Sequence, residues 1–294
     1  MFLLQGMKRI SKILILIIIS LLFQDFGFKR TDYRKGMYRN VCKDLSGNAL
    51  IYVIFVDSKE TVKWTEFDIK STLDSLEQTV RWLNEQASLN GISLNIKTDF
   101  YIGEYTTIKR SMPEGSVKNS VTEPNLKKGI QEMNNWADNI AKKAGASFRI
   151  VEKDGIPEVQ NPRNKERVIA HLRDENNVES VALLFMVNNY YKKDISIALN
   201  TFATEEIEYA VVSYKYPSEI AHNILRLYGA AELYPTVFRK NTKKIEMARE
   251  WFPDDIMQDP YAKNIDELQI GDLTKYLIGW TNTIQSKYEI LLTD

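Results

Sequence analysis

The residues with the clearest chemical meaning in this chain lie between positions 221 and 232. His222 carries an imidazole and Glu232 a carboxylate, and both groups bind zinc in proteins. Arg226 cannot bind a metal, because its guanidinium stays protonated, offers no lone pair and repels a dication. Asn223 cannot act as a general base near neutral pH, although its amide could orient a water or hold a peptide carbonyl. The only other histidine is His171, so one chain cannot supply a three-histidine zinc site.

The spacing of these residues resembles the active-site motif of the metzincin zinc peptidases, His-Glu-x-x-His-x-x-Gly-x-x-His/Asp. In that motif two histidines one helical turn apart bind zinc, and the Glu polarises a metal-bound water. This chain has His222 at the first His, Asn223 at the Glu, Arg226 at the second His, Gly229 at the turn and Glu232 at the third ligand. The resemblance therefore implies a scaffold that has lost its zinc chemistry.

A second stretch extends the resemblance downstream. Residues 252–257 are similar to the segment that places the family's Met-turn, with Met257 as the apolar floor beneath the metal. Read by itself, a methionine such as Met257 is more often a plain core residue than a functional floor. The resemblance covers about residues 48–284. It implies a twisted mixed sheet backed by helices, with the motif helix beneath it, a smaller C-terminal subdomain and a cleft between the two subdomains.

The resemblance also predicts an ion pair. If the fold is kept, Arg226 and Glu232 converge on the former metal position and pin the turn after Gly229 to the helix. A second register pairs Glu219 with His222 as Glu-x-x-His, but it leaves Gly229 seven residues past the histidine, where the motif requires three. The alternative is that His222 binds no metal and is a hydrogen-bonded histidine of a helix, left over from an ancestral site.

The composition is that of a globular protein of one large domain or two small ones. The 294 residues contain 39 basic and 39 acidic side chains, so no bulk charge favours a nucleic-acid partner. Hydrophobic residues make up 44%, which is ordinary for a packed core. Cys42 is the single cysteine, which excludes a disulfide within the chain and a cysteine-based zinc site.

The N-terminus has the pattern of an export signal. Lys8, Arg9 and Lys12 precede an apolar run over residues 13–23, which is shorter than the about 20 residues of a spanning helix. The alternative is a buried core helix. We expect residues 1–24 to be a signal peptide or N-terminal membrane anchor, residues 25–47 a linker, and residues 48–294 a metzincin-like domain.

Hydrophobic patterns predict an α/β (α+β) fold with one mixed sheet. Expected strands are residues 50–56, 92–102 and 181–187, with weaker strands at 195–202 and 208–212. A helix capped by Thr65 and Asp68 should bury a stripe and end at Asn90-Gly91, with further helices over 126–144 and from Pro217. The stripe consists of Ile69, Leu73, Leu76, Val80, Leu83 and Ala87. His171 is expected at the surface, and the basic cluster from Arg239 to Lys244 is expected to be a solvated helix start.

Three functions fit these observations. The first is an exported or membrane-anchored, catalytically inactive metallopeptidase-like protein that binds a peptide or protein partner in its former substrate cleft, with no cofactor. The second is an active zinc metallopeptidase with an unusual ligand set, for instance His222, Glu232 and Glu219. The third is a structural or interaction protein of the cell envelope whose peptidase-like fold is incidental. All three place the chain on the periplasmic or extracellular side.

Overall fold

The computed structural model describes residues 31–34, 42, 44–57, 61–102, 108–109, 125–146, 152–153, 156–157, 164–188, 196–199, 208–213 and 216–294. One compact unit spans residues 32–294. The predicted export segment lies outside the described residues. No helix in the described part is both long and apolar enough to cross a membrane.

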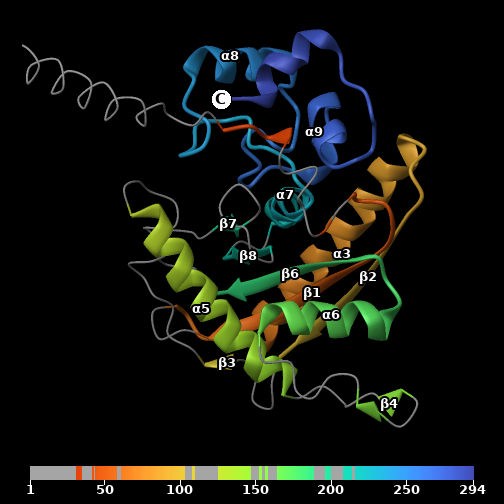
Figure 1. Ribbon diagram of the computed structural model, residues 1–294, viewed down its shortest axis with the longest axis vertical. Coiled ribbons are helices and arrows are strands. Elements are labelled where there is room, and N and C mark those ends of the chain that lie inside the picture. The colour runs from red at the N-terminus through yellow and green to blue at the C-terminus, as the bar shows by residue number, and fades with distance from the viewer. Residues whose placement is uncertain are drawn as a thin grey trace, which may run out of the picture. The chain divides into compact units, whose positions relative to one another are not determined.

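A mostly parallel sheet forms the centre of this unit (Figure 1). Its strand order is β2 (Leu94–Tyr101), β1 (Gly47–Asp57), β6 (Ser180–Val187), β8 (Tyr209–Val212) and β7 (Ser196–Leu199). The short β3 (Ile108–Lys109) also pairs with β1, and among the described strands of this sheet only β7 runs antiparallel to its neighbour. The predicted mixed α/β sheet is thereby confirmed.

Helices cover both faces of the sheet, which explains why β1 and β6 are continuously apolar. On β1, Ile51 and Phe55 face the core formed with α3 (Glu66–Leu89) and α7 (Pro217–Leu227). Leu50 and Ile54 face the opposite core, formed with α5 (Leu126–Gly145) and α6 (Lys165–Asn176). Figure 1 shows α6 and α7 on opposite sides of β6.

The long helix α3 follows its sequence pattern closely. The Thr65 hydroxyl accepts the Asp68 N–H at 3.1 Å, and the Asp68 carboxylate accepts the Thr65 N–H at 3.3 Å. This reciprocal capping satisfies two N-terminal donors of the helix, as predicted. The predicted stripe faces the sheet and α7, with Leu73 and Val80 only partly buried. The helix ends before Gly91, whose φ of +70° reverses the chain.

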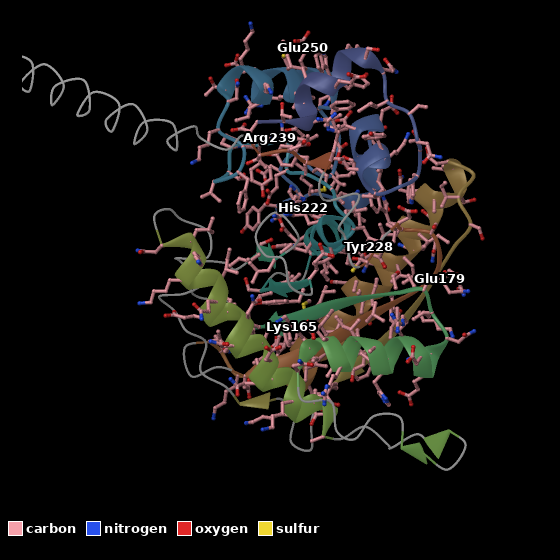
Figure 2. All side chains as sticks on the ribbon, viewed as in Figure 1. Lys165, Glu179, His222, Tyr228, Arg239 and Glu250 are labelled. Atoms are coloured by element: carbon pink, nitrogen blue, oxygen red, sulfur yellow. The ribbon has the colours of Figure 1, made fainter. Side chains whose placement is uncertain are left out.

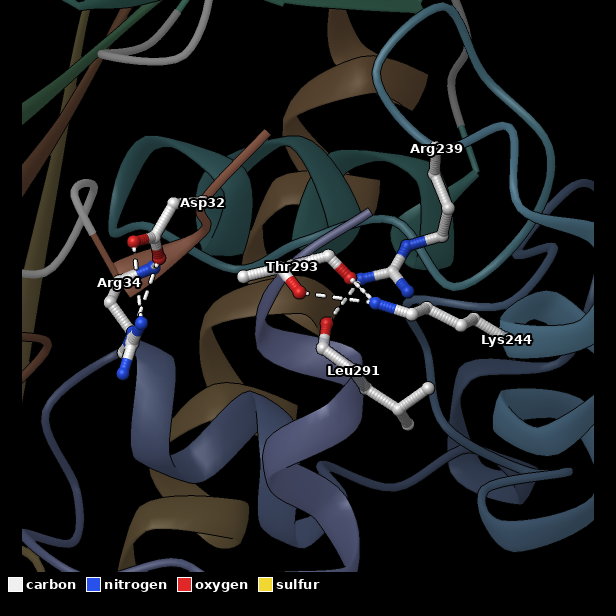
Figure 3. Close-up of polar contacts among 6 residues, drawn as sticks. All are labelled: Asp32, Arg34, Arg239, Lys244, Leu291 and Thr293. Atoms are coloured by element: carbon white, nitrogen blue, oxygen red, sulfur yellow. Dashed lines mark hydrogen bonds and ion pairs between the residues drawn. The ribbon is translucent and has the colours of Figure 1, made fainter. Parts of the chain in front are cut away.

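The C-terminal part consists of α8 (Thr242–Trp251), α9 (Asp272–Leu277) and the short 3-10 helices η2 (Ile265–Glu267) and η3 (Ser286–Leu292). The guanidinium of Arg239 donates to the carbonyl of Leu291 at 3.0 Å, and Lys244 Nζ donates to that of Thr293 at 2.7 Å (Figure 3). Arg239 is fully buried and lies 4.4 Å from the centre of the Tyr33 ring. The prediction of a solvated basic cluster is therefore wrong for Arg239, because a cation–π contact and a buried carbonyl replace its hydration.

Two further expectations need correction. His171 is buried, since α6 turns it toward the sheet, and its Nε2 lies 3.2 Å from Glu175 Oε2. The expected linker also contributes to the folded unit. Three of its described residues, Tyr33, Cys42 and Leu45, are buried. The Leu45 N–H donates to the Ile278 carbonyl at 3.0 Å.

A separate two-stranded sheet joins β4 (Glu152–Lys153) to β5 (Ile156–Pro157).

Candidate functional site

The helix that carries the motif, α7, is buried along almost its whole length. It begins at Pro217, whose fixed φ suits the first helical position. Two hydrogen bonds fix this end: Thr79 on α3 donates to the Pro217 carbonyl at 2.9 Å, and Ser218 donates to the Pro260 carbonyl at 2.8 Å. Contacts with α3 on one side and with β7 and β8 on the other leave little freedom to its side chains.

His222 lies on α7 in the interior of the unit (Figure 2). Its Nδ1 is 3.0 Å from the carbonyl oxygen of Ile256. Because a carbonyl only accepts, Nδ1 carries the proton and Nε2 keeps its lone pair. Burial, and then the nearby charge of Arg226, lower the pKa of His222 to about 3, against the raising effect of the Ile256 hydrogen bond. The imidazole is therefore neutral at physiological pH.

Arg226 and Glu232 form an ion pair between Nη1 and Oε1, which confirms the predicted contact. Both side chains are only about a tenth exposed, at 9% and 10%. The turn at Gly229, where φ is +97°, brings Glu232 back toward the helix. The Ala230 N–H reaches back to the Leu225 carbonyl at 3.0 Å and closes the end of α7. A guanidinium and a carboxylate thus meet one turn along from His222.

Met257 is completely buried and contacts the chain that follows this turn. Its carbonyl accepts the Leu233 N–H at 2.8 Å, which ties residues 255–257 to the chain after the turn. The neighbouring Asp255 accepts hydrogen bonds from the Met257 N–H at 2.7 Å, the Gly271 N–H at 2.9 Å and the Thr274 hydroxyl at 2.9 Å. Burial nevertheless raises the pKa of Asp255 to about 6, and the three hydrogen bonds oppose this rise.

Asn223 connects α7 to strand β7. Its Nδ2 donates to the Glu219 carbonyl at 2.8 Å and to the Ser196 hydroxyl at 2.9 Å. The same hydroxyl donates to Glu219 Oε2 at 3.4 Å. Because the Glu219 carbonyl requires a donor, the orientation of the Asn223 amide is fixed. Its Oδ1 is buried and has no hydrogen-bond partner within the described residues.

Tyr234 completes this group of residues. Its ring centre is 6.1 Å from that of His222, at an interplanar angle of 35°. Burial is the largest cause that raises the pKa of the Tyr234 hydroxyl, and nearby carboxylates add to it. Sequence reasoning did not assign roles to Ser196, Tyr234 or Asp255. Ser196 lies in a short strand far from the motif, so no local spacing could have identified it.

The residues present do not fit a zinc ion. Arg226 places a permanent cation one helical turn from His222, and its charge already lowers the pKa of that imidazole. The Glu232 carboxylate faces this guanidinium instead of the imidazole. Within the part of the chain that the structure describes, no three His, Cys, Asp or Glu side chains come together as a metal site. No zinc-dependent step can be derived from this geometry.

Comparisons with protein families, with curated proteins and with solved structures found no match to this chain.

Proposed function

We propose that this protein is a metzincin-like pseudopeptidase, which binds a peptide or protein partner beside α7 without cleaving it. The observation that carries the proposal is the ion pair between Arg226 and Glu232. It joins the helix to the chain after the glycine turn, where the family would use a metal for the same purpose. Asn223 contributes an amide where hydrolysis would need a carboxylate.

The order of the elements supports the fold part of this proposal. A buried strand, a long helix, a second strand and a later strand pair precede the motif helix, in the order that the resemblance implies. The segment that contains Met257 is hydrogen-bonded to Leu233, which follows the glycine turn. His222 is held by a backbone carbonyl of the same segment, at Ile256. These two contacts support the proposal, because they join positions that the metzincin motif links.

The position of β7 supports peptide binding. Among the described strands β7 is the last in the sheet, with β8 as its neighbour. Its Ser196 contacts Asn223, so this edge lies directly beside the motif residues. Extended peptides commonly bind by adding a strand to a sheet edge. A peptide aligned with β7 would pass along the polar side chains of α7.

Zinc content tests the proposal. The full-length protein, purified without chelators and supplied with zinc, should hold no stoichiometric metal. The Asn223→Glu, Arg226→His double variant restores a carboxylate and a second imidazole, and should gain a tightly held zinc ion. The matched control is the double variant Asn223→Gln, Arg226→Lys, which keeps an amide and a positive charge at the two positions. This control should bind no zinc. Stoichiometric zinc in the unmodified protein, or cleavage that EDTA abolishes, would refute the proposal.

The proposal includes export to the cell envelope, either released or anchored by residues 1–24. Its basis is the order of Lys8, Arg9 and Lys12 before an apolar run. Cell fractionation of the full chain, compared with a variant in which Ile17 and Ile18 are replaced by Asp, tests this part. Equal amounts of both proteins in the soluble cytoplasmic fraction would contradict export.

A further inference from the structure

The strand β2 lies at the end of the sheet opposite to β7. Among the described strands, only β1 pairs with it. Most of its side chains are exposed, namely those of Asn95, Lys97, Thr98, Asp99 and Phe100. An exposed edge strand is a template on which another strand can pair.

The backbone groups of alternate β2 residues point away from β1. The Ser93 carbonyl accepts the Gly47 N–H of β1 at 2.8 Å, so the odd-numbered residues direct their N–H and carbonyl groups toward β1. The Phe100 N–H instead donates to the Asp99 carboxylate at 2.8 Å, as expected for an even-numbered residue that points outward. Thr98, in the middle of the exposed stretch, therefore presents both backbone groups to the outer edge.

The side chains of β2 are complementary to those of a second, antiparallel copy of β2. If a two-fold axis passes through Thr98, Lys97 of each copy lies opposite Asp99 of the other. On the other face of the strand, Phe100 lies opposite Ile96. Sliding one strand by two residues would instead bring Lys97 opposite Lys97 or Asp99 opposite Asp99, which is unfavourable. The charges therefore select one register.

The contacts that these charged groups make within the chain leave room for an intermolecular pair. Lys97 Nζ donates to the Asn176 carbonyl at 3.1 Å, and Asp99 Oδ1 accepts the Phe100 N–H. An ammonium has three donors and a carboxylate accepts several hydrogen bonds. Charged residues on an edge strand ordinarily prevent pairing with another chain. At these positions the opposite signs favour pairing with an identical chain.

We propose that a second copy of this chain binds along β2, so that the two sheets join through an antiparallel β2–β2 pair with its two-fold axis at Thr98. The pair covers the ring of Phe100, which is 43% exposed, with Ile96 of the second copy. A single pair of strands buries little surface, so the dimer should be weak and reversible. This inference is independent of the proposed peptide binding, which uses β7 at the other end of the sheet.

Exchanging the two charges tests the register. Sedimentation velocity of the full-length protein between about 1 µM and 1 mM should show a monomer–dimer equilibrium. Lys97→Asp and Asp99→Lys each place like charges opposite one another, so each variant should dimerise at least about tenfold more weakly. An equal mixture of these two variants should form a heterodimer, because every facing pair is then of opposite sign. The double variant Lys97→Asp, Asp99→Lys should dimerise as the unmodified protein does.

Two further variants separate strand pairing from a general effect of charge or folding. Lys243→Asp makes the same charge change at an exposed position of α8, and should leave dimerisation unchanged. Thr98→Pro removes the outward N–H at the axis, which an edge strand tolerates, and should abolish the dimer, whereas Thr98→Val should keep it. Circular dichroism checks that each variant is folded.

Three results would overturn the inference. They are a monomer at every concentration, a dimer that Lys97→Asp leaves unchanged, and a mixture of the two single variants without heterodimer. None of these results bears on peptide binding at β7, so the proposed function would stand or fall separately.

Discussion

Replacing Arg226 with alanine leaves the carboxylate of Glu232 without the cation that faces it. Both side chains are about nine-tenths buried, so water cannot replace the lost partner well. Removing one member of a buried ion pair costs about 3–5 kcal/mol. Because a tenth of each side chain still reaches solvent, we expect a free energy of unfolding about 3 kcal/mol lower for Arg226→Ala. In a domain of this size, such a loss lowers Tm by about 6 °C or more.

An exposed ion pair in the same protein provides the control. Arg81 and Glu85 lie one turn apart on α3, 4.0 Å from each other, with side chains 63% and 60% exposed. Arg81→Ala should change the free energy of unfolding by no more than about 0.5 kcal/mol, as for other exposed pairs. The double variant Arg226→Met, Glu232→Leu should lose less stability than either single variant, because no charge is left buried.

Urea unfolding followed by far-UV circular dichroism measures Arg226→Ala and Arg81→Ala, together with a double-mutant cycle of the unmodified protein, Arg226→Met, Glu232→Leu and their double variant. The cycle gives the coupling energy between Arg226 and Glu232 directly. If Arg226→Ala unfolds at the same urea concentration and temperature as Arg81→Ala, the ion pair does not hold the turn after Gly229. The ion pair of Arg226 and Glu232 could then no longer be said to take the place of a metal, and the proposed function would lose its main support.

Other expectations test separate parts of the site. His222 should stay neutral from pH 5 to 8, with the proton on Nδ1, and nitrogen NMR can follow it because His171 is the only other histidine. Since the unfolded chain protonates this imidazole below about pH 6.5, its contribution to stability should fall as pH drops through that value toward 3, and His222→Gln should remove this dependence. The raised pKa keeps Asp255 protonated in the folded state up to about pH 6, whereas in the unfolded chain it ionises near pH 4. The free energy of unfolding should therefore fall as pH rises from about 4 to 6. Relative to Asp255→Asn, urea unfolding at each pH should show a loss of roughly 3 kcal/mol across that window. Gly229→Ala should cost about 1–2 kcal/mol because φ is +97°, and an unchanged Tm would show that the turn relaxes. Arg239→Met should lower Tm less than Arg239→Ala, because the methionine retains packing against the ring that the guanidinium covers.

The sequence predicted the elements whose patterns are local and strong. The apolar run of β1, the capping residues of α3 and the stripe from Ile69 to Ala87 each specify one element and one buried face. The direction of β7 was not predicted, because four residues of strand carry no signal for parallel or antiparallel pairing. Strand direction depends on the connections and on the neighbouring strand, which lie outside any short window.

Burial of single polar residues was the least predictable feature. Arg239 stands among basic residues at a helix start, a pattern typical of solvated surface. It is buried because Tyr33 and Leu291, both remote in the sequence, supply a ring and a carbonyl. His171 lies in a helical stretch that runs from Arg167 to Arg173, yet its position on α6 turns it inward. Such contacts depend on tertiary packing, and no spacing along the chain encodes them.

The ion pair between Arg226 and Glu232 was predicted from the resemblance to the metzincin motif, in which both of these positions supply ligands to one metal. In the structure the turn at Gly229, with its positive φ, brings the two charges together. The partner of Asn223 was not predictable, since Ser196 comes from a weak strand. The motif therefore reveals which groups meet at the end of α7, but not which strand lies beside them.

The polar side chains around the end of α7 differ in whether their hydrogen-bonding and charged groups have partners among the described residues. Arg226 meets Glu232, and Asp255 accepts three hydrogen bonds, so these groups hold the turn and the Met257 segment in place. Asn223 has a buried acceptor that no described donor reaches, although its Nδ2 donates to the Glu219 carbonyl and to the Ser196 hydroxyl. The unmet acceptor costs free energy, which these two hydrogen bonds offset in part. Asn223 contacts β7, the last of the described strands in the sheet, and under the proposed function a bound donor would offset the cost of its unmet acceptor. Under the proposed function, changes at Arg226 should act on stability, whereas changes at Asn223 should act on binding as well as on stability, because its Nδ2 makes two hydrogen bonds.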